Sequence, residues 1–148
     1  MNIIKYKPIG IVHSPFKTNN GIPVKPLQER ETEGTVEIFS EYTEGLADLD
    51  GYSHIILLCH FHLSSDYALK VVPFVDKAQK LRGLFSTRSP NRPNSIGLST
   101  VRLVKIENNI LTVKGIDIVD GTPVLDIKPY VTKIDWIEKP TLGWMEEV

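Results

Sequence analysis

The chain has 148 residues, of which 41% are hydrophobic, and its formal net charge at pH 7 is −1. This length and composition predict one globular domain over residues 1–148 and exclude a strongly basic nucleic-acid-binding protein of the usual kind. Cys59 is the only cysteine, which excludes disulfides and a cysteine-based metal cluster, and the sequence has neither a signal-peptide core nor an apolar run of membrane-spanning length, so we expect a cytoplasmic protein.

The apolar residues alternate or form short β-branched runs punctuated by Gly or Pro, a pattern that predicts strands rather than long helices. In chain order, the expected strands are 9–14, 34–39, 54–62, 70–75, 96–106, 110–119 and 124–131. Short helices are expected at 41–49 and 76–81. Asn108-Asn109 is expected to close a tight hairpin, because asparagine tolerates left-handed backbone conformations.

Short strands with few helices predict a mainly β domain, a compact antiparallel barrel or sandwich, because closure or stacking buries one face and limits open edges. The core is expected over about 9–131. The C-terminal tail, 138–148, carries Leu142, Trp144 and Met145. These apolar residues could dock on the body of the domain or on a second subunit.

The nearly neutral total charge conceals an uneven distribution along the chain. Residues 29–50 are mostly acidic, whereas residues 77–106 contain seven Lys or Arg residues and no acidic residue. Such segregation can give a neutral molecule a local positive face, which a phosphate-bearing ligand or RNA would need. Alternatively, the two segments neutralise each other in the fold.

The stretch FSTRSPNRPNSIGLS, Phe85–Ser99, contains two arginines, two prolines and two asparagines before an apolar strand. Pro90 and Pro93 stiffen it, while arginine suits phosphate or carboxylate and asparagine suits an adenine edge. We therefore interpret this loop as a binding surface for an anionic partner that carries a base. The alternative is a structural loop whose arginines bind local carbonyls and acids.

The sequence lacks the GxGxxG, GxxxxGK[ST] and GxSxG patterns of common nucleotide-binding and acyl-transfer sites. If 53–62 is one regular strand, its period of two places His54, His60 and His62 on one face, where they could ligate zinc. Hydrogen-bonded or ligand-contacting histidines are the alternative, because that strand is strongly apolar.

The segment DIVDGTPVLDIKPYV, Asp117–Val131, brings acidic, basic and phenolic groups close together in sequence. On an extended segment Asp126, Lys128 and Tyr130 share one face and could meet in one site. A structural ion pair between Asp126 and Lys128 is the alternative.

The order of these motifs is more specific than any one of them. The series GIVHSPFK, GTVEIF, GLADLDGYSHIILLCHFH, RGLFSTRSPNRPNSIGLS and DIVDGTPVLDIKPYV resembles the TsaA-like family, whose characterised members are TrmO-type tRNA threonylcarbamoyladenosine N6-methyltransferases. The resemblance covers about residues 9–131. Ser95 departs from the proline that the family usually has there.

The resemblance implies a small β-barrel-like fold that binds S-adenosylmethionine, commonly as a homodimer, and methylates N6 of a modified adenosine beside the tRNA anticodon. The cofactor contacts that it implies lie in several separate segments. They are Pro26, Leu27, Gln28, His62, Arg88, Leu98, Lys114, Gly115, Ile116 and Asp117.

For catalysis we assign Asp126 as base or orienting acid, Lys128 to charge developing on the carbamoyl oxygen, and Tyr130 to positioning the base. Arg92 and Arg82 are assigned to RNA phosphates or to the threonine carboxylate of the modified base. The short chain and neutral charge also fit a non-catalytic module that binds S-adenosylmethionine or RNA. A histidine-metal hydrolase is a third reading.

Overall fold

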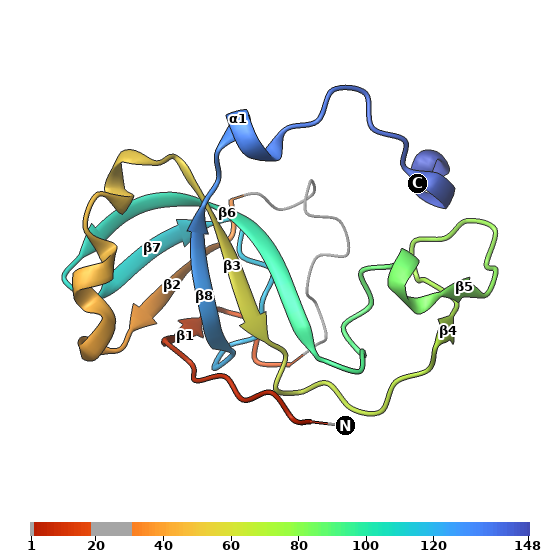
Figure 1. Ribbon diagram of the computed structural model, residues 1–148, viewed down its shortest axis with the longest axis horizontal. Helices are drawn as coiled ribbons and strands as arrows, with labels where there is room; N and C mark the ends of the chain where they lie inside the picture. Colours follow the sequence, from red (N-terminus) through yellow and green to blue (C-terminus); the bar gives the residue numbers. More distant parts are fainter. Residues whose placement is uncertain (1, 19–30) are drawn as a thin grey trace. The chain divides into compact units, whose positions relative to one another are not determined.

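The structure is a computed structural model that describes residues 2–18 and 31–148 (Figure 1). The chain divides into two compact units, here called the barrel unit (Met1–His62 and Ile96–Tyr130) and the second unit (Leu63–Ser95 and Val131–Val148). Whether the chain behaves as one domain stays a prediction. In the described ranges, no helix is both long and apolar enough to cross a membrane.

The barrel unit is a closed antiparallel barrel with the strand order β1-β2-β7-β6-β3-β8, in which β8 returns to β1 (Figure 1). This confirms the prediction of a mainly β, antiparallel barrel. The six strands are β1 (Gly10–His13), β2 (Glu33–Ile38), β3 (His54–His60), β6 (Ile96–Glu107), β7 (Ile110–Lys114) and β8 (Pro123–Pro129).

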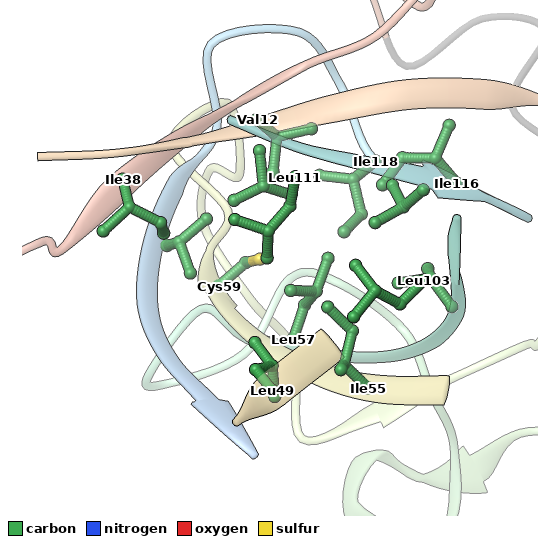
Figure 2. Packing of buried hydrophobic residues seen from close by; sticks show 14 residues of the cluster. Val12, Ile38, Leu49, Ile55, Leu57, Cys59, Leu103, Leu111, Ile116 and Ile118 are labelled. Carbon is green, nitrogen blue, oxygen red and sulfur yellow. The ribbon is translucent and has the colours of Figure 1, made fainter. Parts of the chain in front are cut away.

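The core of the barrel follows from alternation along the strands. On β3, Ile55, Leu57 and Cys59 point inward and are fully buried, while the residues between them face outward. Figure 2 shows the Cys59 sulfur among the aliphatic side chains of this cluster. The other buried members are Val12, Val36, Ile38, Leu49, Val101, Leu103, Leu111, Val113, Ile116, Ile118 and Val124.

Turn residues set both ends of β7, one as predicted and one earlier than predicted. Asn108 has φ 56° and closes the hairpin between β6 and β7, where Glu107 pairs with Ile110. Gly115 has φ 84°, which ends β7 and makes that strand shorter than the expected run to residue 119.

The two expected helices are not regular α-helices. Residues 41–49 fall in two short 3₁₀ helices, η1 (Ser40–Leu46) and η2 (Leu49–Gly51), separated at Asp48, whose φ of 68° interrupts helical geometry. The helix expected at 76–81 is wrong, because the Asp76 carboxylate accepts hydrogen bonds from the backbone N–H groups of Ala78 and Lys80 and holds a turn instead.

The second unit contains a two-stranded sheet of β4 (Lys70–Val71) and β5 (Arg82–Gly83), followed by η3 (Leu84–Ser86). Its C-terminal part carries α1 (Thr132–Asp135) and η4 (Gly143–Glu147). The expected strand 70–75 is therefore much shorter, since Pro73 has no N–H to donate to a sheet.

The C-terminal tail docks within the second unit. The Trp144 indole Nε1 donates to the Ser86 carbonyl at 2.8 Å, and the Arg82 guanidinium lies 5.3 Å from the centre of the Trp144 ring. Arg82 also donates to the buried Asp76 carboxylate at 2.9 Å. This bond, with the backbone donors of the turn, holds the pKa of Asp76 below its usual range.

Residues 63–95 are inserted between two strands that pair with each other. They follow the end of β3 and return at the start of β6, where His60 and Ile96 are register partners in the antiparallel ladder. The insertion therefore leaves and re-enters the barrel at neighbouring positions.

Candidate functional site

The start of β6 is where separate predicted cofactor segments meet. Gly97 is buried, and a Cβ placed on it would overlap the ring of Phe61. Glycine at residue 97 leaves the space that the Phe61 ring occupies. Because His62 follows Phe61 directly, this packing also positions the segment that carries His62. The next residue, Leu98, faces outward and is 49% exposed.

Ser99 connects the same strand to the segment after β7. Its hydroxyl donates a hydrogen bond to Oδ1 of Asp117 at 2.7 Å. Burial raises the pKa of the Asp117 carboxyl, and the hydrogen bond from Ser99 partly offsets that rise. Asp117 is thus a largely buried carboxyl group whose orientation is set by the hydrogen bond from Ser99.

Backbone bonds position the rest of this segment. The N–H groups of Gly115 and Ile116 both donate to the Thr32 carbonyl, at 2.9 and 3.2 Å. Ile116 is fully buried in the core, so its side chain belongs to the barrel interior. Lys114 Nζ lies 3.2 Å from a Glu31 carboxylate oxygen.

Of the predicted cofactor residues, the structure therefore brings Asp117 to Ser99 and places His62 directly after Phe61, whose ring lies against Gly97. Leu98 lies between Gly97 and Ser99 on β6 and faces outward, and Lys114 pairs with Arg102 farther along that strand. Arg88 belongs to the second unit, where it is exposed and makes no hydrogen bond or ion pair with the described residues. The predicted contacts at 26–28 lie outside the described residues.

The predicted catalytic residues lie on the outer face of the barrel. Leu58 of β3 pairs with Asp126 of β8 on one side and with Leu98 of β6 on the other. Neighbouring strands are about 4.8 Å apart, so the Cα atoms of Asp126 and Leu98 are separated by roughly two strand spacings. Asp126, Leu58 and Leu98 therefore form one row across three strands, which places the predicted catalytic carboxylate near the predicted cofactor residue Leu98.

A bulge sets the direction of Asp126. The register between β3 and β8 shifts at Leu58/Cys59, so that Leu125 has no partner of its own and both Val124 and Ile127 stay on the inward side. Asp126 is therefore turned outward.

Lys128 and Tyr130 follow Asp126 on the outer side of β8, at and beyond its end. Lys128 Nζ contacts Asp126 Oδ2 at 2.9 Å, as the ion-pair interpretation expects. The Tyr130 ring packs edge-on against His54, with ring centres 6.5 Å apart.

Asp126 also lines a depression of about 780 Å³, together with residues of the 3₁₀ helices η1 and η2 and of the neighbouring strand ends. Tyr42 and Tyr52 contribute to its walls. It is also lined by four carboxylates, Glu41, Glu44, Asp48 and Asp126. Four carboxylates give this depression a negative charge, which repels phosphate groups.

The histidines do not form the regular face that one long strand would give. His54 and His60 are exposed on β3, but β3 ends at His60, and His62 lies beyond it, with Nε2 3.9 Å from the position of a Cβ built on Gly121. Within residues 2–18 and 31–148, no cluster of three or more His, Cys, Asp or Glu side chains could hold a metal ion.

Cys59 has no features of a nucleophile. It is fully buried, and burial together with the nearby Asp117 raises the pKa of its thiol to about 12. The thiol therefore stays protonated near neutral pH.

The two arginines assigned to RNA, Arg92 in the Phe85–Ser99 loop and Arg82 before it, also bind within the chain. Arg92 Nη1 donates to the carbonyls of Thr87 and Ser89, each at 3.0 Å, and its guanidinium lies 5.8 Å from the centre of the Phe85 ring. Arg82 is held by Asp76 and Trp144, as described above. For Arg92, binding of local carbonyls is what the structural alternative for the loop expects. Contact of Arg82 and Arg92 with RNA stays a prediction.

Sequence reasoning missed Phe61 and Ser99, which connect the predicted segments. A glycine at the start of a strand predicts a close approach of another group, and at Gly97 the structure identifies that group as the Phe61 ring. The partners of Gly97 and Ser99 are distant in sequence or separated by a turn, so no local pattern could identify them.

The family profile of the tRNA-methyltransferase O N-terminal domain matches residues 11–136. A probable S-adenosyl-L-methionine-binding protein of Pyrococcus abyssi is 48% identical over 145 residues, which cover 98% of this chain and 78% of that protein. The tRNA (adenine(37)-N6)-methyltransferase of Homo sapiens is 37% identical over 136 residues, which cover 87% of this chain and 30% of that protein.

Comparison with solved structures identifies the same family. A crystal structure of TrmO from Pseudomonas aeruginosa matches with a TM-score of 0.80 and 38% identity, covering 96% of this chain and 62% of that one. Another crystal structure of TrmO matches with a TM-score of 0.80 and 40% identity, covering 96% and 64%. The chain thus spans less than two thirds of these solved chains. It belongs to the family of the tRNA-methyltransferase O N-terminal domain.

Proposed function

We propose that this chain binds S-adenosylmethionine and transfers its methyl group to N6 of a threonylcarbamoylated adenosine beside the tRNA anticodon. The observation that supports this most is the junction at Gly97–Ser99, which gathers segments carrying His62, Leu98 and Asp117. Relatives named as S-adenosyl-L-methionine-binding proteins and as tRNA (adenine(37)-N6)-methyltransferases support the same cofactor and class of substrate.

The chemistry of these residues fits the cofactor. An Asp117 carboxylate can accept hydrogen bonds from a hydroxyl or ammonium group, and Leu98 offers half-exposed apolar surface. We assign further contacts to His62, to the 114–117 segment, to Arg88 and to 26–28. When bound, S-adenosylmethionine supplies an electrophilic methyl group on a sulfonium centre.

The proposed step is an in-line displacement at that methyl carbon. The N6–carbon bond forms as the carbon–sulfur bond breaks, and S-adenosylhomocysteine leaves. Asp126 accepts the N6 proton, Lys128 stabilises negative charge on the carbamoyl oxygen, and Tyr130 positions the base. The barrel unit places Asp126 and Leu98 on the same face, on either side of Leu58.

Arg92 and Arg82 are proposed to contact RNA phosphates or the threonine carboxylate, and tRNA is the proposed partner. We also propose a homodimer. A non-catalytic module that binds S-adenosylmethionine is the second candidate, because the relatives from Pyrococcus abyssi and Methanothermobacter thermautotrophicus are named only as probable binding proteins.

Arg88→Ala should weaken the binding of S-adenosylmethionine at least tenfold, because a hydrogen bond to a charged group contributes about 1.5–3 kcal/mol. Calorimetric titration measures the affinity. Transfer of a labelled methyl group to tRNA with and without threonylcarbamoyladenosine, followed by nucleoside mass spectrometry, measures the activity.

Lys77→Ala is the matched control, since Lys77 is an exposed cation in the same unit. Equal affinities in both variants would remove Arg88 from the cofactor site. Saturable cofactor binding without transfer to either tRNA would establish the non-catalytic alternative.

Asp126→Asn should lower the turnover number about 10²- to 10⁴-fold at saturating cofactor, because the amide cannot accept the N6 proton. The affinity for S-adenosylmethionine should stay unchanged. Single-turnover transfer kinetics and calorimetry separate the two effects.

Glu107→Gln provides a matched control for Asp126→Asn. Glu107 forms a similar exposed pair with Lys105 at 3.1 Å, two residues away on β6. Turnover of Asp126→Asn within threefold of this control would exclude Asp126 as the base.

A further inference from the structure

We propose that Phe85 is a stacking platform for an unpaired base of the RNA substrate. This inference rests on the proposed function and adds a binding residue to it. Phe85 lies in η3 of the second unit, and its side chain is 74% exposed. Phe85 therefore offers aromatic surface to solvent, and its surroundings distinguish it from other exposed apolar residues of the chain.

Several hydrogen bonds fix the backbone on both sides of this ring. The Ser86 hydroxyl donates to the Gly83 carbonyl at 2.8 Å, and the Thr87 hydroxyl donates to the Leu84 carbonyl at 2.7 Å. Leu84 and Thr87 are both buried. The Trp144 indole also donates to the Ser86 carbonyl. Phe85 is thus presented by an ordered turn, which lowers the entropy lost on binding.

A guanidinium group is associated with the same ring. The central carbon of the Arg92 guanidinium lies 5.8 Å from the Phe85 ring centre, within the range of a cation–π contact, and two carbonyls hold Arg92 in place. An aromatic ring beside arginine is the combination that proteins use to stack unpaired bases of single-stranded RNA.

Charge favours RNA over another apolar occupant. The inserted segment 63–95 has six Lys or Arg residues and two acidic residues, although the whole chain has a net charge of −1. Arg88, three residues after Phe85, is exposed. A positive segment would attract the phosphates that flank an unpaired base.

The test is the affinity of the full chain for a fluorescently labelled tRNA anticodon stem-loop, measured by anisotropy over a series of salt concentrations. Phe85→Ala and Phe85→Leu should each raise the dissociation constant about tenfold, within the range reported for base–aromatic stacking, while Phe85→Trp should retain binding. Leucine is informative because it keeps apolar volume but lacks a π face. Stacking adds no phosphate contact, so the slope of log affinity against log salt should stay unchanged.

Phe74→Ala is the matched control, because Phe74 is an 85% exposed phenylalanine of the same segment. It should leave the RNA affinity within twofold of that of the wild type. Circular dichroism checks that each variant is folded.

The possible failures are distinguishable. Wild-type protein that does not bind the stem-loop would overturn both the proposed function and this inference. Wild-type binding that Phe85→Ala leaves intact would overturn the inference alone. A change of oligomeric state in Phe85→Ala, seen by analytical ultracentrifugation, would assign the ring to an interface between copies and also overturn it.

Discussion

Gly97→Ala should weaken the binding of S-adenosylmethionine at least tenfold, although it adds a single methyl group. The new Cβ would overlap the Phe61 ring, and the three nearest atoms all belong to that ring. Phe61 must then move, and it carries the adjacent His62 with it. Overpacking of this kind costs about 1–3 kcal/mol of stability, so the barrel should still fold while the cofactor segment is displaced.

Calorimetric titration of the folded variant measures this effect, and urea unfolding measures its stability. Gly51→Ala is the matched control, because a Cβ there would meet no atom within 4 Å and Gly51 lies in η2 of the same unit. Wild-type affinity in Gly97→Ala would mean that the Phe61–His62 segment does not contribute to the cofactor site. Rescue of binding by Gly97→Ala combined with Phe61→Leu would support the steric explanation.

Gly10→Ala should destabilise the barrel by about 3 kcal/mol, at the upper end of overpacking costs. Gly10 pairs with Ile38 of β2 and with Val124 of β8, so it lies where the barrel closes. A Cβ at this position would overlap the Glu37 carbonyl oxygen and would lie 3.0 Å from Ile38 Cδ1. A carbonyl of the ladder cannot rotate away as a side chain can, so the strands must separate.

Urea unfolding followed by circular dichroism measures the loss in Gly10→Ala as a lower midpoint. Gly45→Ala, in η1, is the control, because a Cβ there meets no atom within 4 Å. It should be neutral or slightly stabilising, since alanine lowers the entropy of the unfolded chain. A change below 0.5 kcal/mol in Gly10→Ala would show that the closing strands can shift without cost.

The barrel was predictable because its strands are encoded locally. Alternation and β-branched runs located β1, β2, β3, β6 and β8 within a few residues, and Asn108 marked the hairpin. One error arose where a side chain competes with the backbone for hydrogen bonds. Where a helix was expected at 76–81, the Asp76 carboxylate binds two backbone N–H groups and holds a turn. A pattern of helical propensity does not include such side-chain hydrogen bonds.

The candidate site was only partly predictable for a different reason. Family resemblance supplied His62, Leu98 and Asp117 as separate points, but the contacts that connect them require the closed barrel. Ser99 near the start of β6 contacts Asp117, which follows the end of β7. Gly97 of β6 contacts Phe61, which follows β3 and is separated from Gly97 in sequence by the insertion. The bulge at Leu125 likewise follows from pairing with β3, and it decides which way Asp126 faces.

The insertion of residues 63–95 between the paired residues His60 and Ile96 has an evolutionary consequence. Register partners in an antiparallel ladder have Cα atoms about 4.5–5.5 Å apart, a distance that a tight turn can span. Segments of very different length can therefore occupy this position without changing the closure of the barrel. Selection could exchange this inserted segment while the strands of the barrel stay the same, so one scaffold can carry different insertions.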